Sequence, residues 1–295
     1  MFDIVSRTQF AQGGINMTRI RRGFADIEEG QVHYHEGDAG TESGKRPLVM
    51  IHGSPVSSRT VLPFIRRLSP SRRVIAPDTL GNGHSSPPAP EKPDMAYLAD
   101  AHVRALDTLG IEQFDLYGHH TGAKIGVEIA IAHPDRVGKF IIDGASVRQP
   151  DNREMLLSGI KPIEINDDGT HLLRAWHMVR DAYLFFPWWK HTAEARRELG
   201  LPDTAQLHAE VVDMIACIGT YHLVYAAAIG DSLEERLPHL TVPTLVAAAE
   251  TDQLYGEIDD VAGYAPNAEI SRLPSRRDDA GWDAAAEAFA AFLDS

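Results

Sequence analysis

The chain has 295 residues, of which 43% are hydrophobic and 24% charged, and this composition excludes a disordered or fibrous protein. Acidic residues outnumber basic ones by 42 to 28, so the net charge of −14 disfavours nucleic acid and anionic membranes as partners. The single cysteine, Cys217, excludes an intrachain disulfide. We therefore expect a packed cytoplasmic protein, and a homodimer remains possible.

The N-terminal residues precede the regular pattern, and we interpret 1–22 as an N-terminal arm. This arm lacks the continuous apolar core of a signal peptide. No later segment reaches the roughly 18 uninterrupted apolar residues of a membrane span. We therefore expect no membrane partner.

Short apolar runs then alternate with amphipathic stretches, a pattern typical of a mostly parallel sheet covered by helices. The run 31–37 alternates like a half-exposed edge strand. Further strands are predicted at 47–53, 73–79, 114–118, 137–145 and 242–250, with a weaker one at 268–274. Helices are predicted at 58–69, 94–110 and 282–295.

Long helical segments rich in aromatic residues replace this alternation in the middle of the chain. We interpret 148–240 as a helical cap over the carboxyl edge of the sheet, where open α/β sheets bind ligands. The core domain is then formed by 23–147 and 241–295.

Three motifs lie in order along the core: HGSP (52–55), DTLGNGHS (78–85) and GHHTG (118–122). With the order of elements, they resemble the α/β-hydrolase fold superfamily over about 23–295. HGSP is similar to the H-G-x-P of the epoxide hydrolase and haloalkane dehalogenase-like branch. The resemblance implies an α/β-hydrolase fold with a mostly parallel sheet, flanking helices and a cap.

GHHTG has the spacing of the G-x-S-x-G nucleophile elbow, in which a strand turns abruptly into a helix. Small residues at Gly118 and Gly122 let the turn pass closely and leave the side chain of His120 at its tip. The resemblance implies an oxyanion hole formed by the backbone N–H groups of Ser54 and Thr121.

Two departures from the family pattern are visible. The tip residue is His120, where the family carries Ser, Cys or Asp. Asp252 follows the late strand as the family acid does, with Asp143 as an alternative.

The last histidine of the chain is His239, so no histidine follows Asp252. The slot of the family histidine holds Ser275, Arg276, Arg277 and Asp278. The usual Ser-His-Asp mechanism therefore cannot operate.

Our leading hypothesis is that His120, oriented by Asp252, acts as a general base near pH 7. It would activate water against a small apolar or aromatic ester, lactone, epoxide or C–C substrate. Abstraction of a substrate proton would instead give a lyase, isomerase or cyclase, and a covalent histidine adduct is a further alternative.

Two other hypotheses need no base. A metal site could combine His120 with some of His52, His119, His84 and Asp252, although no ligand spacing supports it. An inherited scaffold could bind a ligand without chemistry. We expect no metal and no cofactor.

Several residues are candidates for substrate binding. His52 and His119 flank the motifs, although His52 is also expected to hold its own loop. Aromatic residues of the cap would favour apolar ligands and could donate hydrogen bonds. The cap candidates are Trp176, Tyr183, Trp188, Tyr221 and Tyr225.

Overall fold

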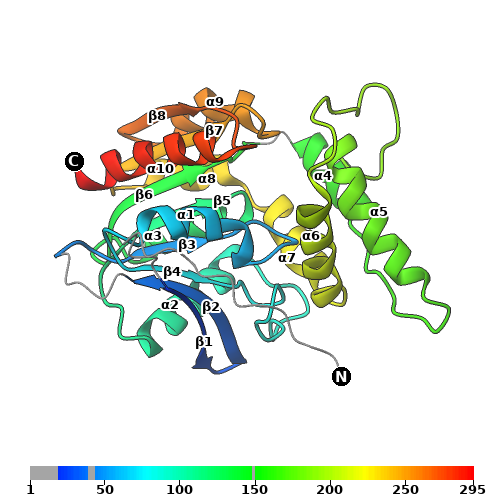
Figure 1. Ribbon diagram of the computed structural model, residues 1–295, viewed down its shortest axis with the longest axis horizontal. Coiled ribbons are helices and arrows are strands. Elements are labelled where there is room, and N and C mark those ends of the chain that lie inside the picture. Colours follow the sequence, from blue (N-terminus) through cyan, green and yellow to red (C-terminus); the bar gives the residue numbers. More distant parts are fainter. Residues whose placement is uncertain (1–18, 39–43, 148–149) are drawn as a thin grey trace, which may run out of the picture.

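A central twisted sheet organises the molecule. The computed structural model describes residues 19–38, 44–147 and 150–295 (Figure 1). Within these residues the sheet has eight strands in the order β1-β2-β4-β3-β5-β6-β7-β8. The strands are β1 (Arg19–Ile27), β2 (Gly30–Asp38), β3 (Leu48–Ile51), β4 (Val74–Pro77), β5 (Phe114–His119), β6 (Val137–Asp143), β7 (Thr244–Ala249) and β8 (Ala268–Leu273). From β4 to β8 all neighbouring strands are parallel, as predicted.

The N-terminal hairpin differs from the prediction. The strand predicted at 31–37 is β2, but it is not an edge strand, because β1 pairs with it on the outside. Residues 19–22 of the predicted arm belong to β1, and residues 1–18 lie outside the described part of the chain. Only one of the nine residues of β1 is fully buried. Its sequence, RIRRGFADI, therefore lacks the apolar run of a core strand.

Helices cover both faces of the sheet. The helices of the core are α1 (Leu62–Leu68), α2 (Met95–Thr108), α3 (Thr121–Ala132), α8 (Leu233–Arg236), α9 (Ile258–Tyr264) and α10 (Asp279–Asp294), with short 3-10 turns η1 (Ser58–Val61), η2 (Leu237–His239) and η3 (Tyr255–Glu257). Alternate residues of β3 point to opposite layers: Val49 and Ile51 pack with α2, α3 and α9, whereas Leu48 and Met50 pack with α1 and α10. This alternation is the period of two expected of a strand buried on both faces.

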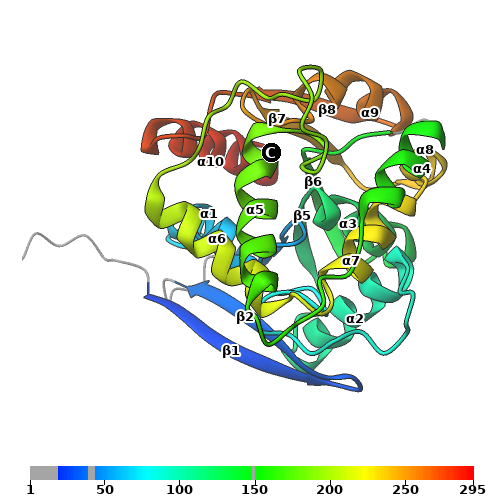
Figure 2. The ribbon, with the colours of Figure 1, turned by 90° about the vertical axis from the view of Figure 1, so that its right-hand side faces the viewer.

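A group of helices covers the carboxyl edge of the sheet. It contains α4 (Pro150–Gly159), α5 (Thr170–Leu184), α6 (Thr204–Ala216) and α7 (Tyr221–Gly230), and Figure 2 shows α5 and α6 crossing in front of the sheet. Helices α5 and α6 share a small core of their own around Met178 and Met214. Leu233 and Leu237, like Val224 and Ala228 of α7, pack with the main core.

Among the described residues no single helix has the length and apolar character needed to cross a membrane. Only α6 and α7 taken together pass that test, by length and composition, and they are bent by 96° at their junction.

Candidate active site

His120 occupies the turn between β5 and α3. Its φ of 49° and ψ of −108° lie outside the ordinary regions for a residue with a side chain, which is typical of a strained functional turn. Its N–H donates to the carbonyl oxygen of Asp143 at 3.2 Å. A Cβ at Gly118 would lie 2.3 Å from the carbonyl oxygen of Gly122, and one at Gly122 would lie 2.1 Å from that of Ile51. Both glycines are therefore required by the close approach of the backbone.

Asp252 holds the ring of His120 by one nitrogen. Nε2 of His120 lies 2.9 Å and 3.0 Å from the two carboxylate oxygens of Asp252. The side chain of Asp252 is only 6% exposed, whereas that of His120 is 25% exposed. Because an ionised carboxylate can only accept, Nε2 carries the hydrogen, and the neutral ring keeps its lone pair on Nδ1. No hydrogen bond from the described residues reaches Nδ1.

His119 shares the same carboxylate. Its ring stacks on that of His120 with centroids 3.9 Å apart, and its Nε2 lies 3.4 Å from Oδ2 of Asp252. Burial alone would raise the pKa of Asp252, but the imidazoles of His120 and His119 outweigh it and hold that pKa well below the usual value. Burial and the charge of His120 lower the pKa of His119. The site therefore combines an ionised Asp252 with a neutral His119.

The same three side chains were a candidate for metal binding. Ligand atoms of His119, His120 and Asp252 lie within 4.8 Å of one another. The two rings are inclined by only 18°, however, and an ion between them would lie outside both ring planes, where the nitrogen lone pairs do not point. His52 and His84 lie elsewhere: His52 is fully buried, and His84 packs against His33. The stacked geometry therefore favours a shared carboxylate over a shared metal.

Arg276 fills the slot in which the family carries its histidine. Its guanidinium makes two hydrogen bonds to Asp143, at 2.5 Å and 3.2 Å, and Tyr117 donates to the same carboxylate at 2.6 Å. The guanidinium also lies over the rings of Phe64 and Trp282. Asp143 is thus engaged by Arg276 and does not orient His120.

Asp278, the other open candidate, has a structural position. Its side chain accepts from the backbone N–H of Gly281 at 2.9 Å and caps the N-terminus of α10.

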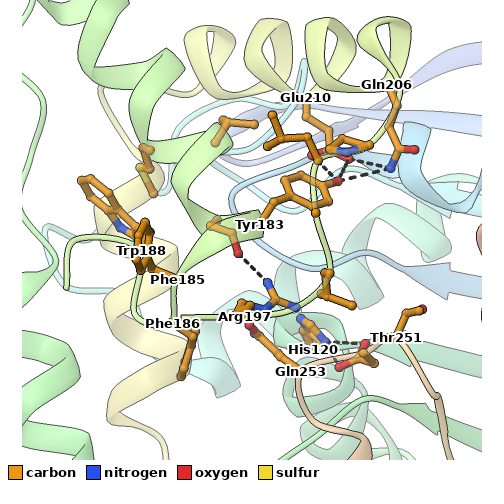
Figure 3. Close-up of a pocket in the computed structure, with 18 of the residues that line it drawn as sticks. His120, Tyr183, Phe185, Phe186, Trp188, Arg197, Gln206, Glu210, Thr251 and Gln253 are labelled. Carbon is orange, nitrogen blue, oxygen red and sulfur yellow. Dashed lines mark hydrogen bonds and ion pairs between the residues drawn. The ribbon is translucent and has the colours of Figure 1, made fainter. Parts of the chain in front are cut away.

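A cavity of about 560 Å³ lies between His120 and the cap. Figure 3 shows His120, Arg197 and Gln253 at one end, with Tyr183, Gln206 and Glu210 at the other. Tyr183 donates to Glu210 at 2.7 Å, and Gln206 donates to both side chains. Burial raises the pKa of Glu210. The cavity therefore carries the His120 and Asp252 pair at one end and an acidic group at the other, with aromatic walls between them.

Arg197, which the sequence reasoning missed, lies in this cavity beside His120 (Figure 3). Its guanidinium donates to the carbonyl oxygen of Ala182 at 2.5 Å. Burial lowers the pKa of Arg197, and the charge of Asp252 opposes that fall. Among the described residues no carboxylate lies within ion-pair distance of the guanidinium. A partly buried cation that lines a cavity without a direct ion pair is suited to an anionic ligand group.

The predicted substrate-binding residues fall into two groups. Tyr183, Trp188 and Tyr225 line the cavity beside His120. His119 lines a neighbouring cavity of about 620 Å³ on the side of Arg276 and Trp282.

Three further candidates do not line the cavities described beside His120. His52 is fully buried, with Nδ1 2.5 Å from the carbonyl oxygen of Gly53 and Nε2 accepting from Thr79 N–H at 3.1 Å. Tyr221 is buried in the core of the cap and donates to the carbonyl oxygen of Lys161. Trp176 is 37% exposed on α5. Aromatic spacing in the cap does not distinguish its inner from its outer face, so the sequence could not separate these residues from those that line the cavity.

The two predicted oxyanion-hole residues lie next to His120. Ser54 and Thr121 line a small cavity together with it, and Thr121 is the first residue of α3. Hydrogen bonds hold the loop that follows β4: Asp78 accepts from the N–H groups of Ser58 and His84, and Ser85 donates to the carbonyl oxygen of Asp78.

Comparisons with known proteins agree with this architecture. The family model described as alpha/beta hydrolase fold matches residues 46–176. The 2-hydroxymuconate semialdehyde hydrolase of Pseudomonas sp. strain CF600 is 39% identical over 122 residues, which are 39% of this chain and 40% of that relative. The chain therefore matches less than half the length of this relative. A putative carbamate hydrolase of Caulobacter sp. strain K31 is 25% identical over 224 residues, covering 75% of this chain and 78% of the relative.

A solved structure extends the likeness of the fold to almost the whole chain. A hydrolase from Pseudomonas aeruginosa PA01 superposes with a TM-score of 0.70 at 18% identity, covering 97% of this chain and 100% of that one. With the family match over residues 46–176 and the strand order, this likeness shows that the chain has the α/β-hydrolase fold. The nearer resemblance to its epoxide hydrolase branch stays a prediction.

Proposed function

We propose that the protein is a hydrolase in which Nδ1 of His120 acts as the general base. The observation that carries this proposal is the hydrogen bond from Nε2 to Asp252, which leaves the Nδ1 lone pair without a partner among the described residues. Gly144 lies against the Cδ2 and Nε2 edge of the ring, so Nδ1 lies on the opposite edge. His120 lines the cavity of about 560 Å³, which we call the large cavity, and a substrate bound there would meet this edge.

The proposed reaction begins with a water molecule beside Nδ1. As the water oxygen forms a bond to the substrate carbonyl carbon, its proton passes to Nδ1, and the imidazolium is stabilised by Asp252. The electron pair of the carbonyl moves to its oxygen, which accepts from the N–H groups of Ser54 and Thr121. The bond to the leaving group then breaks, and Nδ1 returns the proton to that group.

The cavity supports a substrate with an apolar body and a carboxylate. The volume of about 560 Å³ suits a small molecule, and Phe185, Phe186 and Trp188 supply aromatic walls. Arg197 offers a guanidinium that forms no direct ion pair with a carboxylate of the described residues, next to His120. The relative from Pseudomonas is named for 2-hydroxymuconate semialdehyde, itself a carboxylate, and this name supports the same class.

The first test measures turnover on aryl esters, aryl lactones and 2-hydroxy-6-oxodienoates. His120→Ala should lower kcat by roughly 10² to 10⁴, the usual contribution of a general base, and Asp252→Asn should lower it in the same direction. His208→Ala, a change on the exposed side of α6, serves as the control and should leave kcat unchanged. Full activity of His120→Ala would overturn the proposal, as would a product that takes no oxygen from ¹⁸O-labelled water.

The second test addresses the carboxylate. Arg197→Gln should raise KM for a carboxylate substrate by about 10- to 100-fold, because a charged hydrogen bond is lost, and should change KM for its methyl ester little. Arg196→Gln is the matched control, since Arg196 is the exposed neighbour and does not line the cavity. Equal effects of Arg197→Gln on acid and ester would contradict this substrate class.

A further inference from the structure

A second, much smaller cavity is also lined by His120. Its volume is about 70 Å³, and it is bounded by the start of α3, by the loop after β6 and by α7. His120 lines both this small cavity and the large one. Ser54, Phe186, Tyr225 and Gln253 also line both. The two cavities are therefore neighbours that meet at His120.

A third cavity, which we call the outer cavity, adjoins the small one. It has a volume of about 660 Å³ and lies between the cap and the region of η3 and α9. It shares Ser146, Phe186, Gln253 and Leu254 with the small cavity. Phe186 and Gln253 line all three, and Figure 3 shows both side chains near His120.

The small cavity has the size and lining of a site for water. Its volume of about 70 Å³ is large enough for water but too small for the body of a substrate that fills the large one. Thr121, Ser146 and Gln253 provide polar groups along its wall. The outer cavity is lined by charged residues, among them Lys190, Glu257 and Asp260, and these favour a hydrated space.

We propose that the three cavities form a passage that delivers water to His120 from behind the bound substrate. This inference rests on the proposed hydrolysis and deepens it. An apolar substrate anchored at Arg197 would exclude solvent from the large cavity, yet hydrolysis needs one water molecule beside Nδ1. The small cavity brings water to the ring of His120, and the outer cavity refills it after each turnover.

The test narrows the small cavity at Ala228, a buried residue of α7. Ala228 lines the small cavity and neither of the other two. Ala228→Val should lower kcat about tenfold by displacing water from a reactive position, with little change in the Kd of benzoate as a probe of the large cavity. Ala226→Val is the matched control: it places the same side chain in the same helix, at a position that lines none of the three cavities. It should keep the kcat of the wild type.

A crystal structure of the wild-type complex with benzoate provides a second readout. We expect ordered water in the small cavity between Ser146 and His120, continuous with water in the outer cavity. An unchanged kcat in folded Ala228→Val overturns the passage, and so does a dry small cavity in the crystal. If the wild type turns over none of the substrates, the proposed hydrolysis fails, and the crystal alone then decides whether water reaches His120 by this route.

Discussion

Gly144 shows how closely single residues are fitted around His120 and Asp252. A Cβ at this position would lie 2.8 Å from Cδ2 of His120 and 2.9 Å from Oδ2 of Asp252, and the backbone has a φ of +69°. The absence of a side chain is therefore what allows the ring and the carboxylate to meet at the end of β6.

Gly144→Ala should displace the ring and lower kcat/KM by about 10²-fold, since a misplacement of 1 Å at a reacting group has this effect. Gly169→Ala is the control, because Gly169 has a similar φ of +75° but nothing within 4 Å of an added Cβ. Both variants should lose about 1 kcal/mol of stability from the left-handed backbone. Activity assays with urea unfolding separate the two effects, and equal activity of the variants would contradict a steric role.

The sequence predicted the central pair at this scale but not its surroundings. The elbow motif and the late strand end at the same edge of the sheet, so His120 and Asp252 were expected to meet, and their atoms lie 2.9 Å apart. Arg197 was missed because it lies in a stretch of the cap without helical or strand periodicity, where the pattern does not show which side chains face inward.

At the scale of elements, the N-terminus of α10 accounts for the position of Asp278. Asp278 is one of the four residues in the slot of the family histidine, so the sequence left its role open. The structure places its carboxylate on the N-terminus of α10, and it lines the cavity beside Trp282 rather than the one beside His120.

Asp278→Ala should therefore lower the free energy of unfolding by about 1 kcal/mol through loss of the cap, with kcat unchanged. Asp278→Asn keeps a capping side chain and should retain most of the stability. Chemical denaturation and steady-state assays check both expectations. A large fall in kcat for the asparagine variant would show instead that the carboxylate acts in the site.

The elements themselves were predicted with uneven success, for physical reasons. Buried parallel strands such as β5 and β7 are continuous apolar runs, which the sequence displays directly. By contrast, β1 exposes most of its residues and carries Arg19, Arg21 and Arg22, so pairing with β2 rather than burial maintains it. Such a strand is visible only once its partner is known.

At the scale of the whole molecule, buried histidines link stability to pH. Burial lowers the pKa of His102 to about 3 and that of His35 to about 4, from 6.5. The unfolded chain protonates these rings near pH 6.5, and the folded chain does so only near those lower values. At pH values between about 6.5 and these lower pKa values, the unfolded state binds more protons than the folded state. Stability that is present above about pH 6.5 is therefore lost as the pH falls towards about 3.

We expect the free energy of unfolding to fall by a few kcal/mol between about pH 7 and about pH 4. Each unit of difference between the pKa of a histidine in the folded and in the unfolded chain is worth about 1.4 kcal/mol. Urea unfolding across this range measures the slope. His102→Gln should make the slope shallower, because it removes one buried ring that must stay neutral. His208→Gln, at an exposed position, should leave it unchanged, and an equally steep slope in His102→Gln would rule out this source.

The pair formed by Arg276 and Asp143 limits the routes by which such a site can change. A serine at position 120 would face a guanidinium where a triad requires an imidazole, and a guanidinium does not accept a proton. A histidine at position 276 would in turn lack a hydroxyl to activate while His120 remains. A Ser-His-Asp triad therefore requires two substitutions together, one at position 120 and one at position 276. With only one of the two made, the chain has just part of the groups that either mechanism requires.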